Sequence, residues 1–168
     1  MDRLVKAIDT LNSAVGKVLC WAALALALWQ FGLILAQAVF RASSIFAQEA
    51  LIYANALLFL GAGGYTLLKD GHVRVDLFYH RMGQRAQARV NLLGTALLLW
   101  PLCGLIFYAG TPYVLDSWAL REGSIETSGI QAVFLLKSLI LVFATLVGLQ
   151  GLSLALRSIQ TLQGKADD

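Results

Sequence analysis

The chain has 168 residues, of which 58% are apolar and only 14% charged, and its mean hydropathy is +0.70. So few polar side chains cannot cover a water-soluble domain of this length, and the bilayer is therefore the expected solvent. The net charge of +3 could indicate a nucleic-acid partner, but the basic residues flank apolar segments instead of lining a groove, which argues against that class.

Four stretches without a charged residue are long enough to cross a membrane, because a crossing helix needs about 20 residues. Backbone polar groups in hydrocarbon must be paired within their own segment, and these stretches lack the alternation of barrel strands, so we expect helices. The first stretch exceeds the apolar core of a signal peptide, which favours an uncleaved anchor, and Pro101 predicts a kink in the third. The sequence predicts an all-α membrane protein, one membrane domain over residues 1–168, with transmembrane helices at about 18–40, 50–68, 90–115 and 138–156.

Two further segments are expected to lie on the membrane surface. In residues 1–17, apolar side chains recur at helical spacing from Leu4 to Val15, which is typical of an amphipathic interfacial helix. Such a helix could brace a partner subunit or simply rest on lipid headgroups. Residues 69–89 mix polar and apolar side chains, and a helix from about Val73 would carry one apolar stripe, which predicts an amphipathic elbow between the second and third spans.

Within the elbow, three residues follow Gly71 in an alternating pattern: His72, Arg74 and Asp76. One interpretation is a solvated connection anchored to lipid through its basic and apolar side chains. The other is that charge-assisted hydrogen bonds among these three side chains fix the turn, and with it the angle between the two spans or a contact with a partner.

The basic residues predict the orientation of the chain. Cytoplasmic connections retain Lys and Arg during insertion. Ten of the 13 Lys and Arg residues fall in the N-terminal segment, the elbow and the C-terminal tail, whereas the other side holds only Arg41, Arg121 and Lys137. Both termini are therefore predicted to be cytoplasmic. Lys137 lies at the outer end of the fourth span, where it could contact a substrate or partner or extend toward the headgroups.

The residues that carry chemistry in other small membrane proteins are missing from the predicted spans. None of the ten carboxylates falls within a span, which argues against a self-sufficient ion-coupled carrier. His72 and His80 share one loop and cannot ligate haem from facing helices. Cys20 and Cys103 are isolated in apolar sequence and favour packing over a metal site or disulfide. We therefore expect no catalytic, cofactor-binding or metal site.

Three motifs resemble those of the small membrane subunit of TRAP transporters, the DctQ family. The most specific is Gly71-His72-Val73-Arg74-Val75-Asp76-Leu77, directly after a glycine-rich second span. Ser124-Ile125-Glu126-Thr127-Ser128 and Lys137-Ser138-Leu139 are similar in order and spacing. The resemblance covers nearly the whole chain.

The resemblance implies a tripartite uptake system in the bacterial inner membrane. In that family a periplasmic binding protein delivers an organic acid, typically a carboxylate, to a large membrane subunit that imports it with sodium ions. The small subunit is then a fixed multi-pass scaffold without a cofactor, because the sodium sites belong to the large subunit. The loop that carries Arg121, Glu122 and Glu126 is expected to lie near the docked binding protein. The alternatives are a freestanding small exporter and a membrane assembly protein.

Overall fold

A computed structural model describes residues 2–72 and 79–164 of the chain, and all regular structure in these ranges is helical. Four of its helical segments are long and apolar enough to cross a membrane, as the sequence predicts. They are α1 (Asp2–Phe40), α2 (Ile45–Gly61) continued by α3 (Gly63–Leu68), α4 (Gln84–Gly94) continued through η2 (Thr95–Leu99) into α5 (Trp100–Ala119), and α6 (Val133–Leu162). A 3₁₀ turn, η1 (Tyr79–Arg81), precedes α4.

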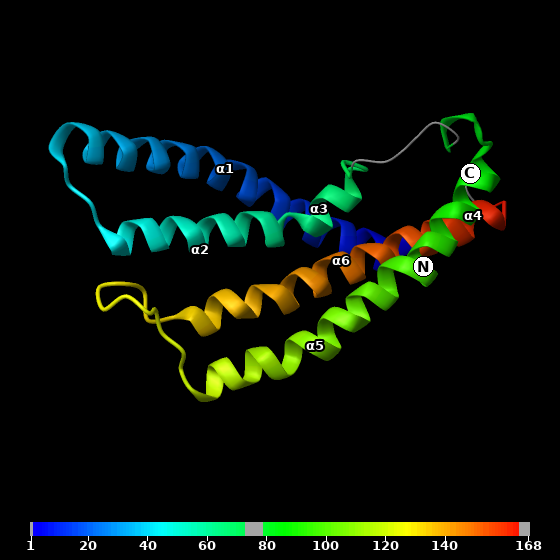
Figure 1. The fold of residues 1–168 in the computed structure, drawn as a ribbon. Coiled ribbons are helices and arrows are strands. Elements are labelled where there is room, and N and C mark those ends of the chain that lie inside the picture. The colour runs from blue at the N-terminus through cyan, green and yellow to red at the C-terminus, as the bar shows by residue number, and fades with distance from the viewer. Residues whose placement is uncertain (1, 73–78, 165–168) are drawn as a thin grey trace.

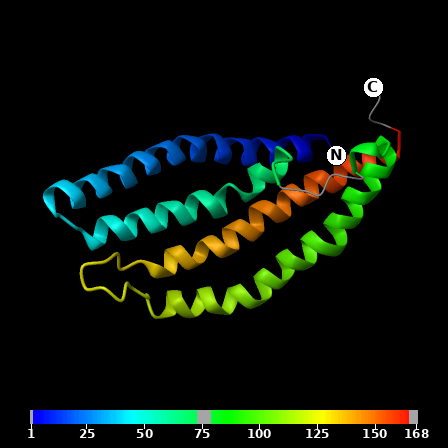
Figure 2. The same cartoon turned by 45° about the horizontal axis from the view of Figure 1, so that its top comes forward.

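The helices form a layer with α6 at its centre. In Figures 1 and 2, α1, α2, α6 and α5 lie side by side in that order, and both termini lie at the same end as the end of α3 and the start of α4. Helix α6 packs against α1, α2, α3, α4 and α5, whereas α5 packs mainly against α6. Accordingly, 33% of the residues in the most apolar stretch of α6 are buried, compared with 6% of those in the corresponding stretch of α1. The remaining apolar faces need lipid or another protein around them.

Helix α1 differs from the predicted division into an interfacial helix at residues 1–17 and a span that follows it. It runs without interruption from Asp2 to Phe40. The side chains of Leu4 and Leu11, expected to face lipid, are 51% and 46% exposed, whereas a neighbouring stripe is buried against α3 and α6. This stripe contains Val5, Ile8, Asn12, Gly16 and Leu19. The N-terminal part of α1 is therefore held by contacts with α3 and α6.

A polar network joins this part of α1 to the second half of α6. The Asp9 carboxylate accepts hydrogen bonds from Gln150 Nε2 at 3.0 Å and Ser153 Oγ at 2.8 Å, and it forms an ion pair with Arg157. Asn12, which is fully buried, donates from Nδ2 to Gln150 Oε1 at 2.9 Å. Polar pairs between membrane helices are worth about 0.6 kcal/mol on average and rarely more than about 2 kcal/mol each. Several such contacts between α1 and α6 fix both the position of α1 and its rotation about its own axis.

Small residues let α1, α3 and α6 approach one another closely. A Cβ on Gly63 would lie 2.6 Å from Phe143 Cε2, and a Cβ on Gly64 would fall on the side-chain amide of Asn12, 3.0 Å from the carbonyl oxygen of Leu146. Glycine is therefore required at both positions for α3 to fit between its neighbours.

The third crossing changes its helical register just before Pro101, where the sequence predicts a kink. Residues Thr95–Leu99 form a π-helical turn, and Pro101 follows in the first turn of α5. Proline has no N–H group and crowds the carbonyl four residues earlier, so the wider turn accommodates it. Part of the predicted elbow is the first turns of α4, which begins at Gln84. The sequence predicts a helix that starts at about Val73. Residues 73–78 of that segment lie outside the described residues.

Replacing Gly64 by alanine tests the close contact of α1 with α3. The added methyl group would overlap the buried amide of Asn12, so we expect Gly64→Ala to destabilise the fold by about 1–3 kcal/mol, the usual cost of overpacking. The control is Gly104→Ala, since a Cβ there meets no atom within 4 Å. Thermal unfolding of both variants in detergent provides the comparison. Equal melting temperatures would contradict the packing described here.

Candidate functional site

The connection between α5 and α6, residues 120–132, contains the three charged residues that the sequence singles out: Arg121, Glu122 and Glu126. The loop leaves α5 through Arg121, whose φ of 45° lies in the left-handed region, and the backbone N–H of Glu122 then donates to the Ser117 carbonyl at 3.0 Å. This turn brings the Glu122 side chain back against the end of α5. We call residues 120–132 the α5–α6 loop.

Glu122 and Lys137 are brought together across the ends of α5 and α6. They form an ion pair, and Ser117 Oγ donates to the same Glu122 carboxylate at 2.7 Å. The Lys137 ammonium also lies 4.0 Å from the centre of the Tyr113 ring. The Lys137 side chain is only 15% exposed, so its charge is satisfied within the chain. Neither extension toward the headgroups nor contact with a substrate is needed to explain it.

Glu49, in the first turns of α2, holds the α5–α6 loop at two points. Its carboxylate accepts hydrogen bonds from Ser124 Oγ and from the backbone N–H of Ile130, the latter at 2.6 Å. Tyr53 OH, one turn further along α2, donates to the carbonyl oxygen of Ile130 at 3.4 Å. These contacts tie both halves of the loop to the first hairpin, so the loop presents a defined surface.

The exposed part of this surface combines charges with apolar side chains. Arg121 and Glu126 are exposed, and Ile125 between them is fully exposed, at 103% of its reference area. Beside them lies a hollow of about 420 Å³ between α2, α6 and the loop, lined in part by Glu49, Glu122 and Ile125. An apolar tip flanked by both charge signs is suited to binding another protein.

The elbow residues can be placed only in part. His72 is exposed and borders a second, larger hollow between α3, α6 and α4–α5, whereas Arg74 and Asp76 lie outside the described residues. The proposed contacts among these three side chains thus stay a prediction. Within residues 2–72 and 79–164, no three His, Cys, Asp or Glu side chains gather in a way that could hold a metal ion.

Sequence reasoning missed the role of Glu49. The sequence assigns Glu49 no role, yet its carboxylate binds the α5–α6 loop at both Ser124 and Ile130. The available signal was a single carboxylate at a span boundary, where an unpaired charge would be costly and a partner is therefore expected. The sequence around Glu49 does not indicate that the partner comes from the α5–α6 loop.

Hydrogen bonding sets the charge state of Glu122. The hydrogen bond from Lys137 lowers the pKa of the Glu122 carboxyl group, and the one from Ser117 lowers it further. Both donors stabilise the ionised form, which is the form that can pair with the ammonium group. Glu122 is therefore ionised, and able to pair with Lys137, at neutral pH.

One family was found when the chain was compared with known proteins. The family model described as tripartite ATP-independent periplasmic transporters, DctQ component, matches residues 26–161. The comparison with curated proteins and the comparison with solved structures each found no match.

The lowered pKa of Glu122 predicts a pH-dependent stability. The pKa of Glu122 in the folded chain lies below its ordinary value of 4.5, so ionised Glu122 stabilises the fold above pH 4.5. This contribution is lost as the pH falls through the pKa of the folded chain. We expect the wild type to melt above Glu122→Gln at pH 7 and the difference to vanish in acid. The control Glu126→Gln, at an exposed side chain, should melt near the wild type at pH 7. A difference that does not change with pH would contradict the proposed ion-pair contribution.

Proposed function

This chain belongs to the DctQ component family of tripartite ATP-independent periplasmic transporters, and on that premise we propose that it is a fixed scaffold subunit supporting a larger membrane subunit. The observation that carries the proposal is that three carboxylates near the ends of its crossings are held in contacts within the chain. Asp9 is bound by α6, Glu49 holds the α5–α6 loop, and Glu122 is paired with Lys137. Side chains fixed in this way support a frame better than a moving ion-coupling site.

The transport reaction itself is assigned to the partner subunits. We propose a multi-pass location in the bacterial inner membrane with both termini cytoplasmic, supported by the basic residues at the end where the termini lie. The large subunit would carry an organic acid, such as a carboxylate, together with sodium ions. A periplasmic binding protein would select the substrate, and this chain would need no cofactor. A freestanding exporter and a membrane assembly protein are the competing functions.

The shape of the chain supports this division of labour. A layer of four crossings presents broad apolar faces, and it is braced at one end by the α1–α6 network and at the other by Glu49 and Glu122. A carrier that shifts within the bilayer needs a neighbour that does not move with it. A wide layer held at both ends is suited to that role.

We further propose that the α5–α6 loop contributes to docking of the periplasmic binding protein. In the proposed orientation the loop faces the periplasm, with Arg121 and Glu126 exposed around Ile125. Glu122 supports the surface from within, because it is paired with Lys137. Charges at the rim of an interface mainly change the association rate and its dependence on salt.

The scaffold role predicts an assembly defect without a change in specificity. If the elbow fixes the frame, Arg74→Ala and Asp76→Ala should lower the yield of complex co-purified with the large subunit and lower sodium-driven uptake. The relative uptake rates of different organic acids should stay unchanged, because other subunits bind the substrate. Normal yield and uptake in both variants would exclude the role of the elbow. Uptake by this chain alone in vesicles would exclude the scaffold role itself.

The docking role predicts that reversing exposed charges weakens the response to the binding protein. For Arg121→Glu and Glu126→Lys, the binding-protein concentration that gives half-maximal uptake should rise by roughly threefold or more, and most strongly at low salt. Arg41→Glu is the control, since Arg41 is exposed in the α1–α2 connection, which lies at the same end of the molecule as the α5–α6 loop. An unchanged concentration dependence in both loop variants would exclude the docking surface.

A further inference from the structure

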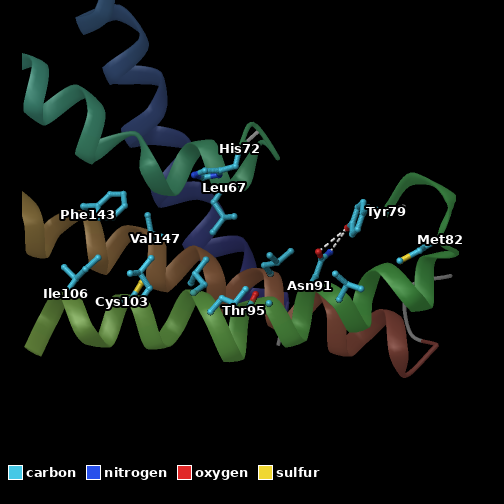
Figure 3. A pocket seen from close by; sticks show the side chains of 16 residues that line it. Leu67, His72, Tyr79, Met82, Asn91, Thr95, Cys103, Ile106, Phe143 and Val147 are labelled. Atoms are coloured by element: carbon cyan, nitrogen blue, oxygen red, sulfur yellow. Dashed lines mark hydrogen bonds between the residues drawn. The ribbon is translucent and has the colours of Figure 1, made fainter. Parts of the chain in front are cut away.

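A long groove runs between α6 and the third crossing, beneath α3. Its volume is about 670 Å³, and its side chains come from α3, η1, the third crossing and α6 (Figure 3). Cys103 and Ile106 of α5 face Phe143 and Val147 of α6 at one end, and the groove follows the π-helical turn toward α4. Its lining is mostly apolar over the part that lies among the membrane crossings.

Among the described residues that line this groove, most polar side chains lie toward one end, the end where both termini lie. There, Tyr79 and Asn91 are joined by a hydrogen bond of 2.9 Å and Met82 lies at the same end, whereas His72 lies beside Leu67 (Figure 3). A second hollow of about 310 Å³ continues from Asn91 between α4 and α6, and polar side chains such as Gln87 line it. The combined shape has an apolar body and one polar end, which matches an amphiphile lying along the helices.

The polar end also carries positive charge. Arg81 and Arg89 directly adjoin Met82 and Val90, which line the groove, and Arg85 lies one turn before Arg89 on α4. All three guanidinium side chains belong to exposed residues, and no ion pair joins any of them to another described residue. Arginine forms bidentate hydrogen bonds with phosphate and is attracted to anionic headgroups.

We propose that this groove binds an anionic phospholipid, with an acyl chain along Cys103, Phe143 and Val147 and the phosphate at the arginine-rich end of α4. A lipid fits better than a helix of a partner protein, because most of the polar lining lies toward one end and the three arginines adjoin that end. The bound lipid would fill the space between α3 and α5, which are not packed against each other. The proposal depends on the membrane location of the chain and not on its role in transport.

Two glycines of the third crossing allow a sharp test. Gly94 lines the groove, and Gly104 does not, yet a Cβ at either position meets no atom within 4 Å. A side chain can therefore start at either position without a clash at its Cβ, so Gly94→Phe would direct a ring toward the groove, and Gly104→Phe would add the same ring elsewhere on the same crossing. The full-length chain is purified in detergent, stripped of lipid, and titrated with dioleoyl phosphatidylglycerol or dioleoyl phosphatidylcholine, with binding counted by native mass spectrometry.

We expect the wild type and Gly104→Phe to bind one phosphatidylglycerol about tenfold or more tightly than phosphatidylcholine, since several arginines attract the anionic headgroup. Gly94→Phe should weaken phosphatidylglycerol binding by about tenfold or more, because the ring takes the place of the acyl chain. Replacing Arg81, Arg85 and Arg89 together by glutamine should remove the preference for phosphatidylglycerol. If Gly94→Phe does not elute as a folded, monodisperse species, Gly94→Leu provides the same comparison.

Three results would overturn the proposal. The first is equal phosphatidylglycerol binding by Gly94→Phe and Gly104→Phe, which would place the lipid elsewhere. The second is equal affinity of the wild type for the two lipids, which would show that the groove does not select an anionic headgroup. The third is a Gly94 variant that binds lipid normally but no longer co-purifies with a larger membrane protein. This result would identify the groove as the binding site of a partner helix.

Discussion

The contact between the N-terminal part of α1 and the second half of α6 is the constraint on which the rest of the structure depends. Within a bilayer the hydrophobic effect does not draw helices together, because lipid tails are as apolar as the side chains they would replace. A layer that buries so few side chains must therefore be held by close packing and polar pairs. Asp9, Asn12 and Gln150 provide these pairs at a crossing where Gly64 allows close approach.

The same principle recurs at the other end of the molecule with different residues. There Glu49 joins α2 to the α5–α6 loop, and the ion pair of Glu122 with Lys137 joins the ends of α5 and α6. The first hairpin, α1 with α2 and α3, is thus joined to the second at both ends, through α6 at one end and the α5–α6 loop at the other. Asp9, Glu49 and Glu122 serve this bracing, which agrees with the proposal that ion coupling belongs to a partner subunit.

Sequence reasoning succeeded where a single physical length decides the outcome. A crossing must be about 20 residues long and free of charge, so four helices could be placed from the positions of Lys, Arg, Asp and Glu. It did not reveal that α1 continues through Lys17, because a lysine can extend along a helix without ending it. Contacts between distant positions, such as Asp9 with Arg157 and Glu49 with Ser124, were also missed. They depend on which crossings are neighbours, and that order is not encoded in the spacing of one segment.

A distance measured during transport tests most directly whether this chain is a fixed frame. Spin labels at Ala42 and Leu120, both exposed and in different hairpins, would report on the end opposite the termini once Cys20 and Cys103 are replaced by serine. In the complex with the large subunit, adding sodium, substrate and binding protein should change the distance between the labels by less than about 2 Å, the scale of small helix shifts. A displacement of about 5 Å or more, equivalent to one helical turn, would show that the chain moves with the carrier.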